Sequence, residues 1–253
     1  MIVTDVVGGR GYVRLANPEQ RNALDGDDWR ALGDAMRAME LESPVRTIVV
    51  VAEGRTFCAG AQVDWMRAAP REELAYAPRA LEQMRACSKP IVARVHGSAY
   101  GGGVGLVAAC DLVVASREAR FVLSETRLAV APAMVSQAVI GRVGGARFRA
   151  WALTGTPVSA DEALSAGLVD RVAAPAELDA ALEEVCTALG EAEPVALAAV
   201  KQLFPHGFAA PAAVELLAEL RARPEFAEGI AALREKRPPS WATTPSPGGR
   251  GLG

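Results

Sequence analysis

The sequence predicts an α/β protein with layered packing, because segments typical of strands alternate with segments typical of helices along most of the chain. Its 253 residues are 51% hydrophobic and 23% charged, which is ordinary for a folded globular protein and unlike a disordered chain. The last third is helical by pattern, so the alternation belongs to the first two thirds.

The N-terminal elements follow from local patterns. Residues 2–7 and 12–15 are rich in apolar and β-branched residues around the turn Gly8–Gly11, which predicts a hairpin. Residues 27–41 form a helix by pattern, with apolar residues at steps of three, four and three: Trp29, Leu32, Met36 and Met39. Residues 47–52, TIVVVA, predict a strand covered on both faces.

The middle of the chain repeats this alternation with glycine-rich loops. A loop over 53–62 opens a short helix at 62–67, and a second helix starts or breaks near Pro78. Residues 91–95 predict a buried strand, 96–103 a loop and 104–109 a helix buried on nearly all sides. Two short strands are expected at 112–115 and 120–123.

Helices dominate from residue 159 onward. Ser159 and Glu162 predict a capping box, Gly167 ends that helix, and 168–172 is a last strand. Helices are expected over 175–190, 194–203, 211–222 and 224–236. We therefore divide the chain into a core (1–190), a helical region (191–237) and a flexible tail (238–253), with Trp241 as the tail's only anchor.

Charge and hydropathy exclude several classes of partner. Lys and Arg number 27 against 30 Asp and Glu, giving a net charge of −3, and no basic block resembles a nucleic-acid arm. No apolar run approaches the roughly 20 residues that span a bilayer, and the N-terminal residues lack a signal-peptide layout. We expect a cytoplasmic protein that binds neither nucleic acid nor membrane.

The cysteines and histidines offer little chemistry. The four cysteines lack metal-ligand or disulfide spacing, so we expect reduced packing thiols and no metal site: Cys58, Cys87, Cys110 and Cys186. His96 and His206 are the two histidines, and no nucleophile motif accompanies either. Both are expected to be structural or surface residues.

Three glycine-rich segments are candidate ligand loops: 57–62, 100–105 and 143–146. A triple glycine between a strand and a helix lets a ligand reach backbone N–H groups directly, and two such groups converging on one oxygen form an oxyanion hole. A dinucleotide site is the competing interpretation, although Leu106 occupies the third glycine position of that motif. A purely structural tight turn is the other alternative.

Glu125 is the candidate acid or base. It follows the apolar segment 121–124, and a carboxylate beside such a surface has a raised pKa that suits proton transfer near neutral pH. A solvated loop glutamate is the simpler interpretation of the same residue.

Several segments in order resemble the enoyl-CoA hydratase/isomerase (crotonase) family: FCAGA at 57–61, KPIVA at 89–93, HGSAYGGG at 96–103, CDL at 110–112, TGTPVSADEALSAGLVDRV at 154–172 and EGIAALREKR at 228–237. The likeness covers roughly residues 1–237. It implies a crotonase-like spiral of ββα turns, with a helical C-terminal region that builds homotrimers, often stacked as dimers of trimers.

The resemblance also implies a site for an acyl-CoA thioester. The backbone N–H groups of Ala61 and Gly102 would hold the thioester oxygen, and Ala59 belongs to the same loop. The segment Arg21, Asn22 and Ala23 would contact the CoA adenine. Lys236 would reach the CoA of a neighbouring subunit, or is simply a solvated lysine at a helix end. Coenzyme A is part of the substrate, and no cofactor or metal is implied.

One position departs from the family pattern. The family's hydratases usually carry two glutamates; the second matches Glu125, whereas Gly105 stands at the first. The segments GAQVDWM, GGGVGL, LSETRLAVAPAMVS and EKRPPSW are similar to the bacterial 3-methylglutaconyl-CoA hydratase type, many of which have this glycine. The implied reaction is the reversible dehydration of 3-hydroxy-3-methylglutaryl-CoA in leucine breakdown, with Glu125 as acid/base.

Such a substrate has a distal carboxylate that needs a cation or several donors. The candidates near the loops are Arg67, Arg127 and Tyr100, while Trp65 and Met66 either wall the pocket or pack in the core. Rival functions are an enoyl-CoA isomerase or decarboxylase using a single glutamate, and a non-catalytic scaffold or RNA-binding relative.

Overall fold

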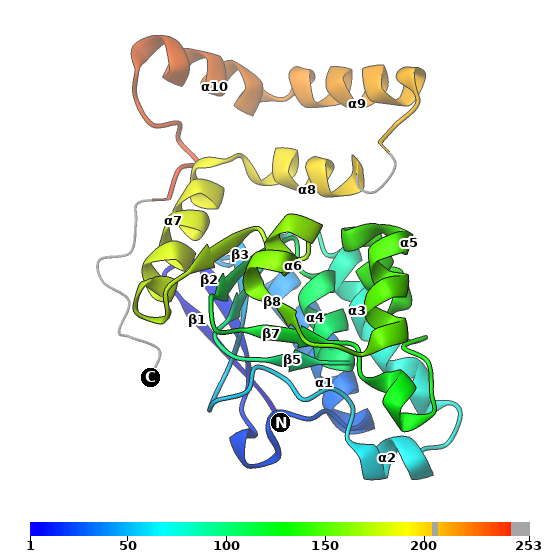
Figure 1. Cartoon of the computed structure of the whole chain (residues 1–253). Helices are drawn as coiled ribbons and strands as arrows, with labels where there is room; N and C mark the ends of the chain where they lie inside the picture. The colour runs from blue at the N-terminus through cyan, green and yellow to red at the C-terminus, as the bar shows by residue number, and fades with distance from the viewer. Residues whose placement is uncertain (204–206, 244–253) are drawn as a thin grey trace.

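A six-stranded sheet forms the centre of the molecule in the computed structural model, which describes residues 1–203 and 207–243 (Figure 1). Its strand order is β1-β2-β3-β4-β6-β9, with β1 and β2 antiparallel and the other neighbours parallel. The strands are β1 (Ile2–Val7), β2 (Arg10–Leu15), β3 (Thr47–Ala52), β4 (Ile91–Val95), β6 (Leu112–Ser116) and β9 (Arg171–Ala173). The predicted hairpin and buried strands are confirmed, and the last strand lies toward the end of its predicted range.

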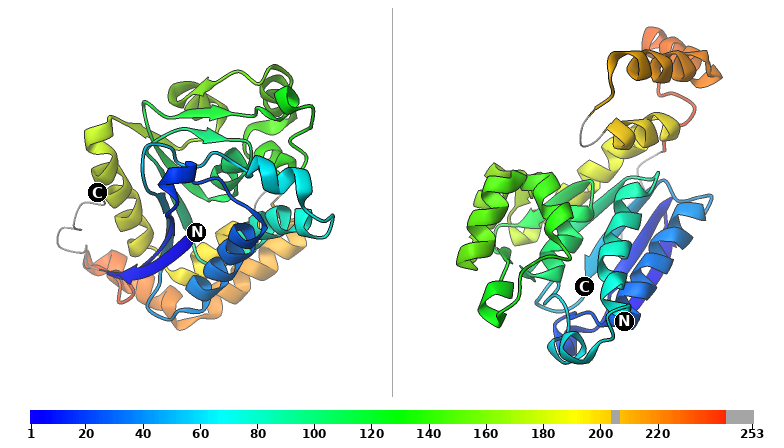
Figure 2. Two further views of the ribbon diagram at one scale, coloured as in Figure 1. Left: turned by 90° about the horizontal axis from the view of Figure 1, so that it is seen from below. Right: turned by 90° about the vertical axis from the view of Figure 1, so that its right-hand side faces the viewer.

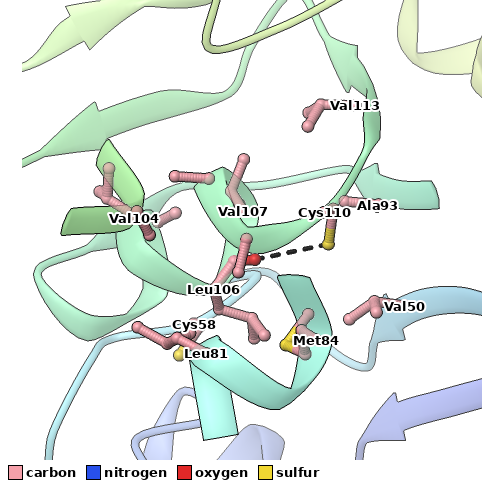
Figure 3. Packing of buried hydrophobic residues seen from close by; sticks show 14 of the residues in the cluster. Val50, Cys58, Leu81, Met84, Ala93, Val104, Leu106, Val107, Cys110 and Val113 are labelled. Atoms are coloured by element: carbon pink, nitrogen blue, oxygen red, sulfur yellow. Dashed lines mark hydrogen bonds between the residues drawn. The ribbon is translucent and has the colours of Figure 1, made fainter. Parts of the chain in front are cut away.

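Both faces of this sheet are covered, as the apolar run in β3 predicts. Ile48 and Val50 face the main core, while Val49 and Val51 belong to a second cluster formed with α7 (Leu178–Glu191). The main core lies under α1 (Gly26–Leu41), α3 (Tyr76–Ala86) and α4 (Gly102–Ala109). Figure 3 shows the side chains of α4 packed among α3 and the strands, with the Cys110 thiol donating to the Leu106 carbonyl at 3.4 Å.

A small second sheet lies beside the first, in the order β5 (Ala99–Tyr100), β7 (Arg120–Val122) and β8 (Val158–Ser159). The segment predicted as a loop at 96–103 therefore contains a strand, β5, which pairs in parallel with β7. Two-residue strands have no measurable periodicity, so their pairing depends on neighbours distant in sequence. The short helix α2 (Val63–Ala68) follows the first glycine-rich loop, as expected.

The third glycine-rich segment is not a loop. Residues 143–146 lie inside α5 (Ser136–Thr154), where Gly144 has non-helical angles and kinks the helix. Nothing described lies within 4 Å of a Cβ built on Gly144 or Gly145, so this segment forms no ligand cradle.

The capping box predicted before α6 (Ala160–Ala166) is half formed. Ser159 Oγ accepts from the Glu162 backbone N–H, and Gly167 ends the helix in the left-handed conformation. The Glu162 carboxylate, however, accepts from Trp151 Nε1 at 3.2 Å, so it is occupied by a tertiary contact that sequence spacing could not indicate.

The C-terminal helices are α8 (Pro194–Leu203), α9 (Ala210–Ala222) and α10 (Pro224–Glu235). Helices α9 and α10 lie beyond α8, on its far side from the sheets (Figures 1 and 2). Trp241 is anchored as expected, since its Nε1 donates to the Glu191 carbonyl at 3.0 Å. It is not the only anchor, because the Ser240 N–H donates to Glu228 at 2.8 Å and the Thr243 N–H donates to the Gly190 carbonyl at 3.1 Å. Residues 244–253 lie outside the described part. No helix among the described residues is long and apolar enough to cross a membrane.

The cysteines and His96 have structural positions, as predicted. All four cysteines are free and buried. The His96 ring is hydrogen-bonded through Nε2 to the Gly54 carbonyl at 2.8 Å, and burial lowers its pKa. His206 lies outside the described residues.

Candidate active site

Two backbone N–H groups converge where the first two glycine-rich loops meet. A Cβ built on Gly60 would lie 3.1 Å from the Gly102 nitrogen, and one built on Gly102 would lie 3.4 Å from the Ala61 nitrogen. Leu24 pairs with the first loop through two hydrogen bonds: its N–H donates to the Gly60 carbonyl, and its carbonyl accepts from the Gln62 N–H. The Ala61 N–H between them has no backbone partner in the described structure. Gly102 is the first residue of α4, so its N–H has no intrahelical acceptor.

Glycine is required at two positions that shape this approach. Gly60 has φ +87°, and a side chain there would meet the Tyr100 carbonyl at 2.7 Å. Gly101 has φ +46°, and its Cβ would lie 2.9 Å from Oε1 of Glu125. The Ala61 and Gly102 amides thus lie close together at the N-terminus of α4, beside a carboxylate, and amides at such a position can stabilise a developing oxyanion.

Glu125 begins the 3₁₀ helix η3 (Glu125–Leu128), directly after the small sheet. Its Oε2 is buried and has no hydrogen-bond partner among the described residues. Burial raises the pKa of this carboxyl, while a hydrogen bond from its own backbone N–H opposes the shift. An unpaired carboxylate with a raised pKa is suited to accept and return a proton near neutral pH.

A cavity of about 300 Å³ opens beside the two amides and Glu125. Its wall is almost entirely apolar, and none of its lining residues is Arg, Lys or His. The lining residues are Trp29, Ala59, Gly60, Ala61, Met66, Leu74, Ala77, Gly101, Gly102, Ser124, Glu125, Leu128, Val130, Ala131, Pro132, Ala133, Met134 and Val135. The site therefore accommodates an apolar chain attached to a polarised carbonyl.

Gly105, the position that departs from the family pattern, lies one turn along α4 from Gly101. A Cβ built on Gly105 would lie 2.4 Å from Cγ1 and 2.6 Å from Cβ of Val135, and 3.2 Å from Leu81 Cδ1. The space is therefore filled by Val135, and a second carboxylate has no room there without a rearrangement. Sequence reasoning did not single out Val135, because its packing partner is thirty positions earlier in the chain.

The segment 21–23 lies against the first glycine-rich loop. The Arg21 carbonyl accepts from the Ala59 N–H at 3.0 Å, and the Ala23 carbonyl accepts from Gln62 Nε2 at 3.5 Å. Asn22 is buried, and its Nδ2 donates to the carbonyls of Glu53 at 2.8 Å and Thr56 at 2.9 Å. The Asn22 side chain thus supports the loop that presents Ala61.

Of the two residues expected to wall the pocket, Met66 lines it and Trp65 does not. The Trp65 indole packs at Gly26, and its Nε1 donates to Glu73 at 3.1 Å. Tyr100 contributes its backbone to β5, where its N–H donates to the Cys58 carbonyl at 2.9 Å, and it is not a lining residue either.

The cations expected near the site lie elsewhere. Arg67 is exposed and lies 3.7 Å from Asp64 in its own helix, and Arg127 packs at Gly155 and donates to the Thr154 carbonyl at 3.4 Å. Lys236 is the C-cap residue of α10, a helix that lies beyond α8 on the side away from the two sheets (Figure 2), and it does not line the cavity. The described residues contain no cluster of three or more His, Cys, Asp or Glu that could hold a metal ion.

The fold and this site bring two backbone amides and one buried carboxylate together, an arrangement suited to an enzyme that polarises a carbonyl and moves a proton. Comparison with known proteins identifies the family. The model of the family described as enoyl-CoA hydratase/isomerase matches residues 8–244. The chain belongs to the enoyl-CoA hydratase/isomerase family, and its substrate is an acyl-CoA thioester.

Individual relatives agree with this assignment. A Thermus thermophilus protein, described only provisionally as an enoyl-CoA hydratase, is 32% identical over 250 residues, covering 92% of this chain and 98% of its own. The mevalonyl-coenzyme A hydratase sidH of Aspergillus fumigatus is 32% identical over 241 residues, covering 90% and 89%. A crystal structure of a Mycobacterium smegmatis enoyl-CoA hydratase superposes with a TM-score of 0.88 at 33% identity, covering 95% of this chain and 98% of its own. The predicted crotonase-like fold is confirmed.

Proposed function

We propose that the protein catalyses the reversible addition of water to a 2-enoyl-CoA, with Glu125 as its only catalytic carboxylate. The observation that carries this proposal is the Glu125 carboxyl against Gly101, whose Oε2 has no hydrogen-bond partner among the described residues, next to the N–H groups of Ala61 and Gly102, which have no backbone acceptor there. The amides hold the thioester oxygen, so that charge developing on it is stabilised. Loss of one such donor typically costs about 3 kcal/mol of transition-state stabilisation.

In this mechanism a single carboxyl handles the proton in both directions. During hydration, Glu125 accepts a proton from water as the water oxygen bonds to C3, and the thioester becomes an enolate. The same carboxyl then returns the proton to C2, which restores the carbonyl. Dehydration is the reverse.

We propose a C3-branched acyl chain, with 3-methylglutaconyl-CoA and 3-hydroxy-3-methylglutaryl-CoA as the first pair to test. Supporting this choice are the motif similarity to that subgroup and the likeness to a hydratase named for mevalonyl-CoA, whose acyl chain is also branched at C3. The cavity offers no Arg, Lys or His to the distal carboxylate of the first pair. A neutral distal group therefore suits the wall of this chain better than an anionic one.

The assay follows the absorbance of the enoyl thioester with 3-methylglutaconyl-CoA, 3-hydroxy-3-methylglutaryl-CoA, mevalonyl-CoA and crotonyl-CoA in parallel. We expect turnover of branched substrates, which Glu125→Gln reduces by about 10²-fold or more. Activity on crotonyl-CoA alone would contradict the branched assignment, and full turnover by the Gln variant would contradict the role of Glu125.

The single carboxylate favours one second candidate, a double-bond isomerase or decarboxylase. Val135 fills the space at Gly105, and both of these reactions need one acid/base beside an enolate. Double-bond migration or CO2 release without hydration would support this candidate over the first.

We also propose a homotrimer, alone or stacked as a dimer of trimers, in which Lys236 approaches a neighbour's coenzyme A. Supporting this is the number of exposed apolar side chains on the C-terminal helices, among them Val200, Val214, Leu217 and Leu233. Sedimentation equilibrium measures the assembly mass, and a stable monomer would contradict the proposal.

A further inference from the structure

Gly101 is the N-cap residue of α4, with φ +46° and ψ −110°, and Gly105 lies in the first turn of that helix. The Gly105 N–H donates to the Gly101 carbonyl at 3.2 Å, which confirms one regular turn between them. Neither glycine has a side chain, so Glu125 and Val135 approach the backbone of α4 and its N-cap closely at these two positions. Glu125 occupies the space above Gly101, and Val135 occupies the space above Gly105.

The two side chains that occupy the space beside these glycines differ in chemistry. Glu125 supplies the carboxyl, and Val135 supplies two methyl groups about one helical turn away, in the wall of the same cavity. A thioester held at Ala61 and Gly102 places its C2 near Glu125. Val135 lines the same cavity as Glu125, so it is available in the wall to a substituent on C3.

We infer that Val135 is a specificity-determining residue: it is seated on Gly105 and, in the wall of the cavity, its side chain contacts an alkyl branch on C3 of the acyl chain. This inference rests on the proposed acyl-CoA function and deepens it, because it gives the branched substrate class a structural basis. This arrangement needs both Gly105 and Val135, because any side chain at position 105 would displace Val135 from its place in the cavity wall.

Binding of unreactive thioesters tests this inference without requiring turnover. Calorimetry measures the Kd of 3-methylbutanoyl-CoA and of butanoyl-CoA, which differ by one methyl group on C3. We expect the wild type to bind the branched thioester more tightly, and Val135→Ala to reduce this preference by about fourfold, since a buried CH₂ contributes about 0.8 kcal/mol. Val135→Thr keeps the shape of the side chain and should also reduce the preference.

Val139→Ala is the matched control. Val139 is buried one turn further along α5 and does not line the cavity, and its change to alanine removes the same two carbon atoms. The ratio of the two Kd values, for butanoyl-CoA and 3-methylbutanoyl-CoA, should therefore be the same in Val139→Ala as in the wild type. The inference would be overturned if the wild type bound the two thioesters with equal Kd, or if both Val135 variants kept the wild-type ratio of the two Kd values. Failure of the proposed reaction is distinguishable, because it would appear as absent hydration of every enoyl-CoA while the binding preference persisted.

Discussion

Replacing Gly105 by alanine should destabilise the protein, although the same change elsewhere in a helix stabilises it. A methyl group at 105 would lie 2.4 Å from Cγ1 and 2.6 Å from Cβ of Val135, so Val135 and its backbone must shift. Overpacking of this kind costs about 1–3 kcal/mol, and the better helix propensity of alanine returns up to about 1 kcal/mol. We expect a net loss of about 1 kcal/mol in the free energy of unfolding.

Urea unfolding measures this change in the free energy of unfolding. All variants are compared at one protomer concentration, because the stability of an oligomer depends on concentration. Gly145→Ala is the control: Gly145 is exposed in α5 with nothing within 4 Å of its Cβ, so alanine should stabilise by about 0.5 kcal/mol. Val135→Ala alone should cost about 2 kcal/mol.

The double variant of Gly105 and Val135 completes the cycle. Val135→Ala removes the contact at 2.4 Å from Cγ1 but keeps the Cβ atom at 2.6 Å, so it relieves only part of the overlap. The double variant should therefore be about 1 kcal/mol more stable than additivity predicts. If Gly105→Ala stabilises as much as Gly145→Ala, or if the two changes are additive, then Val135 does not fill the space at Gly105.

Three further predictions concern the carboxylate, the thiols and the supporting loop. Burial raises the pKa of Glu125, so the folded state holds this proton more tightly than the unfolded chain. Its unfavourable contribution to the free energy of unfolding therefore develops as pH rises from the unfolded-state pKa to the higher folded-state pKa and is complete above it. Unfolding curves at several pH values should show that Glu125→Gln relieves this contribution at neutral pH. For the same reason kcat should fall on acidification at a higher pH than an ordinary glutamate would cause, and a profile flat to pH 4 would contradict the raised pKa. Burial raises the pKa of the Cys58 thiol to about 12, so a thiol reagent should label the native protein far more slowly than the urea-unfolded chain, and equal rates would contradict the buried position. Asn22→Ala removes the donors to two loop carbonyls and should lower the free energy of unfolding in urea by about 2–3 kcal/mol. It should also lower kcat, and an unchanged kcat would show that the position of Ala61 does not depend on this support.

Much of the fold was predictable from local sequence. The hairpin, α1, β3 and the buried strands follow from apolar periodicity, which depends only on which faces a segment buries. The same reasoning missed β5 and β8 and placed a loop at 143–146, because two-residue strands and a kinked helix have no pattern of their own. Their conformation is decided by partners far along the chain.

By itself the sequence determined the α/β class, the two glycine loops, and Glu125 as the candidate acid/base, whereas the family resemblance singled out Ala61 and Gly102 within those loops. These are properties of residue type and local order, since glycine and a carboxylate carry their chemistry wherever the chain places them. Only the tertiary structure decided that Val135 fills the space above Gly105 and that Trp65 lies outside the cavity. Whether a space is open or filled depends on close packing between distant segments, which neither composition nor periodicity encodes.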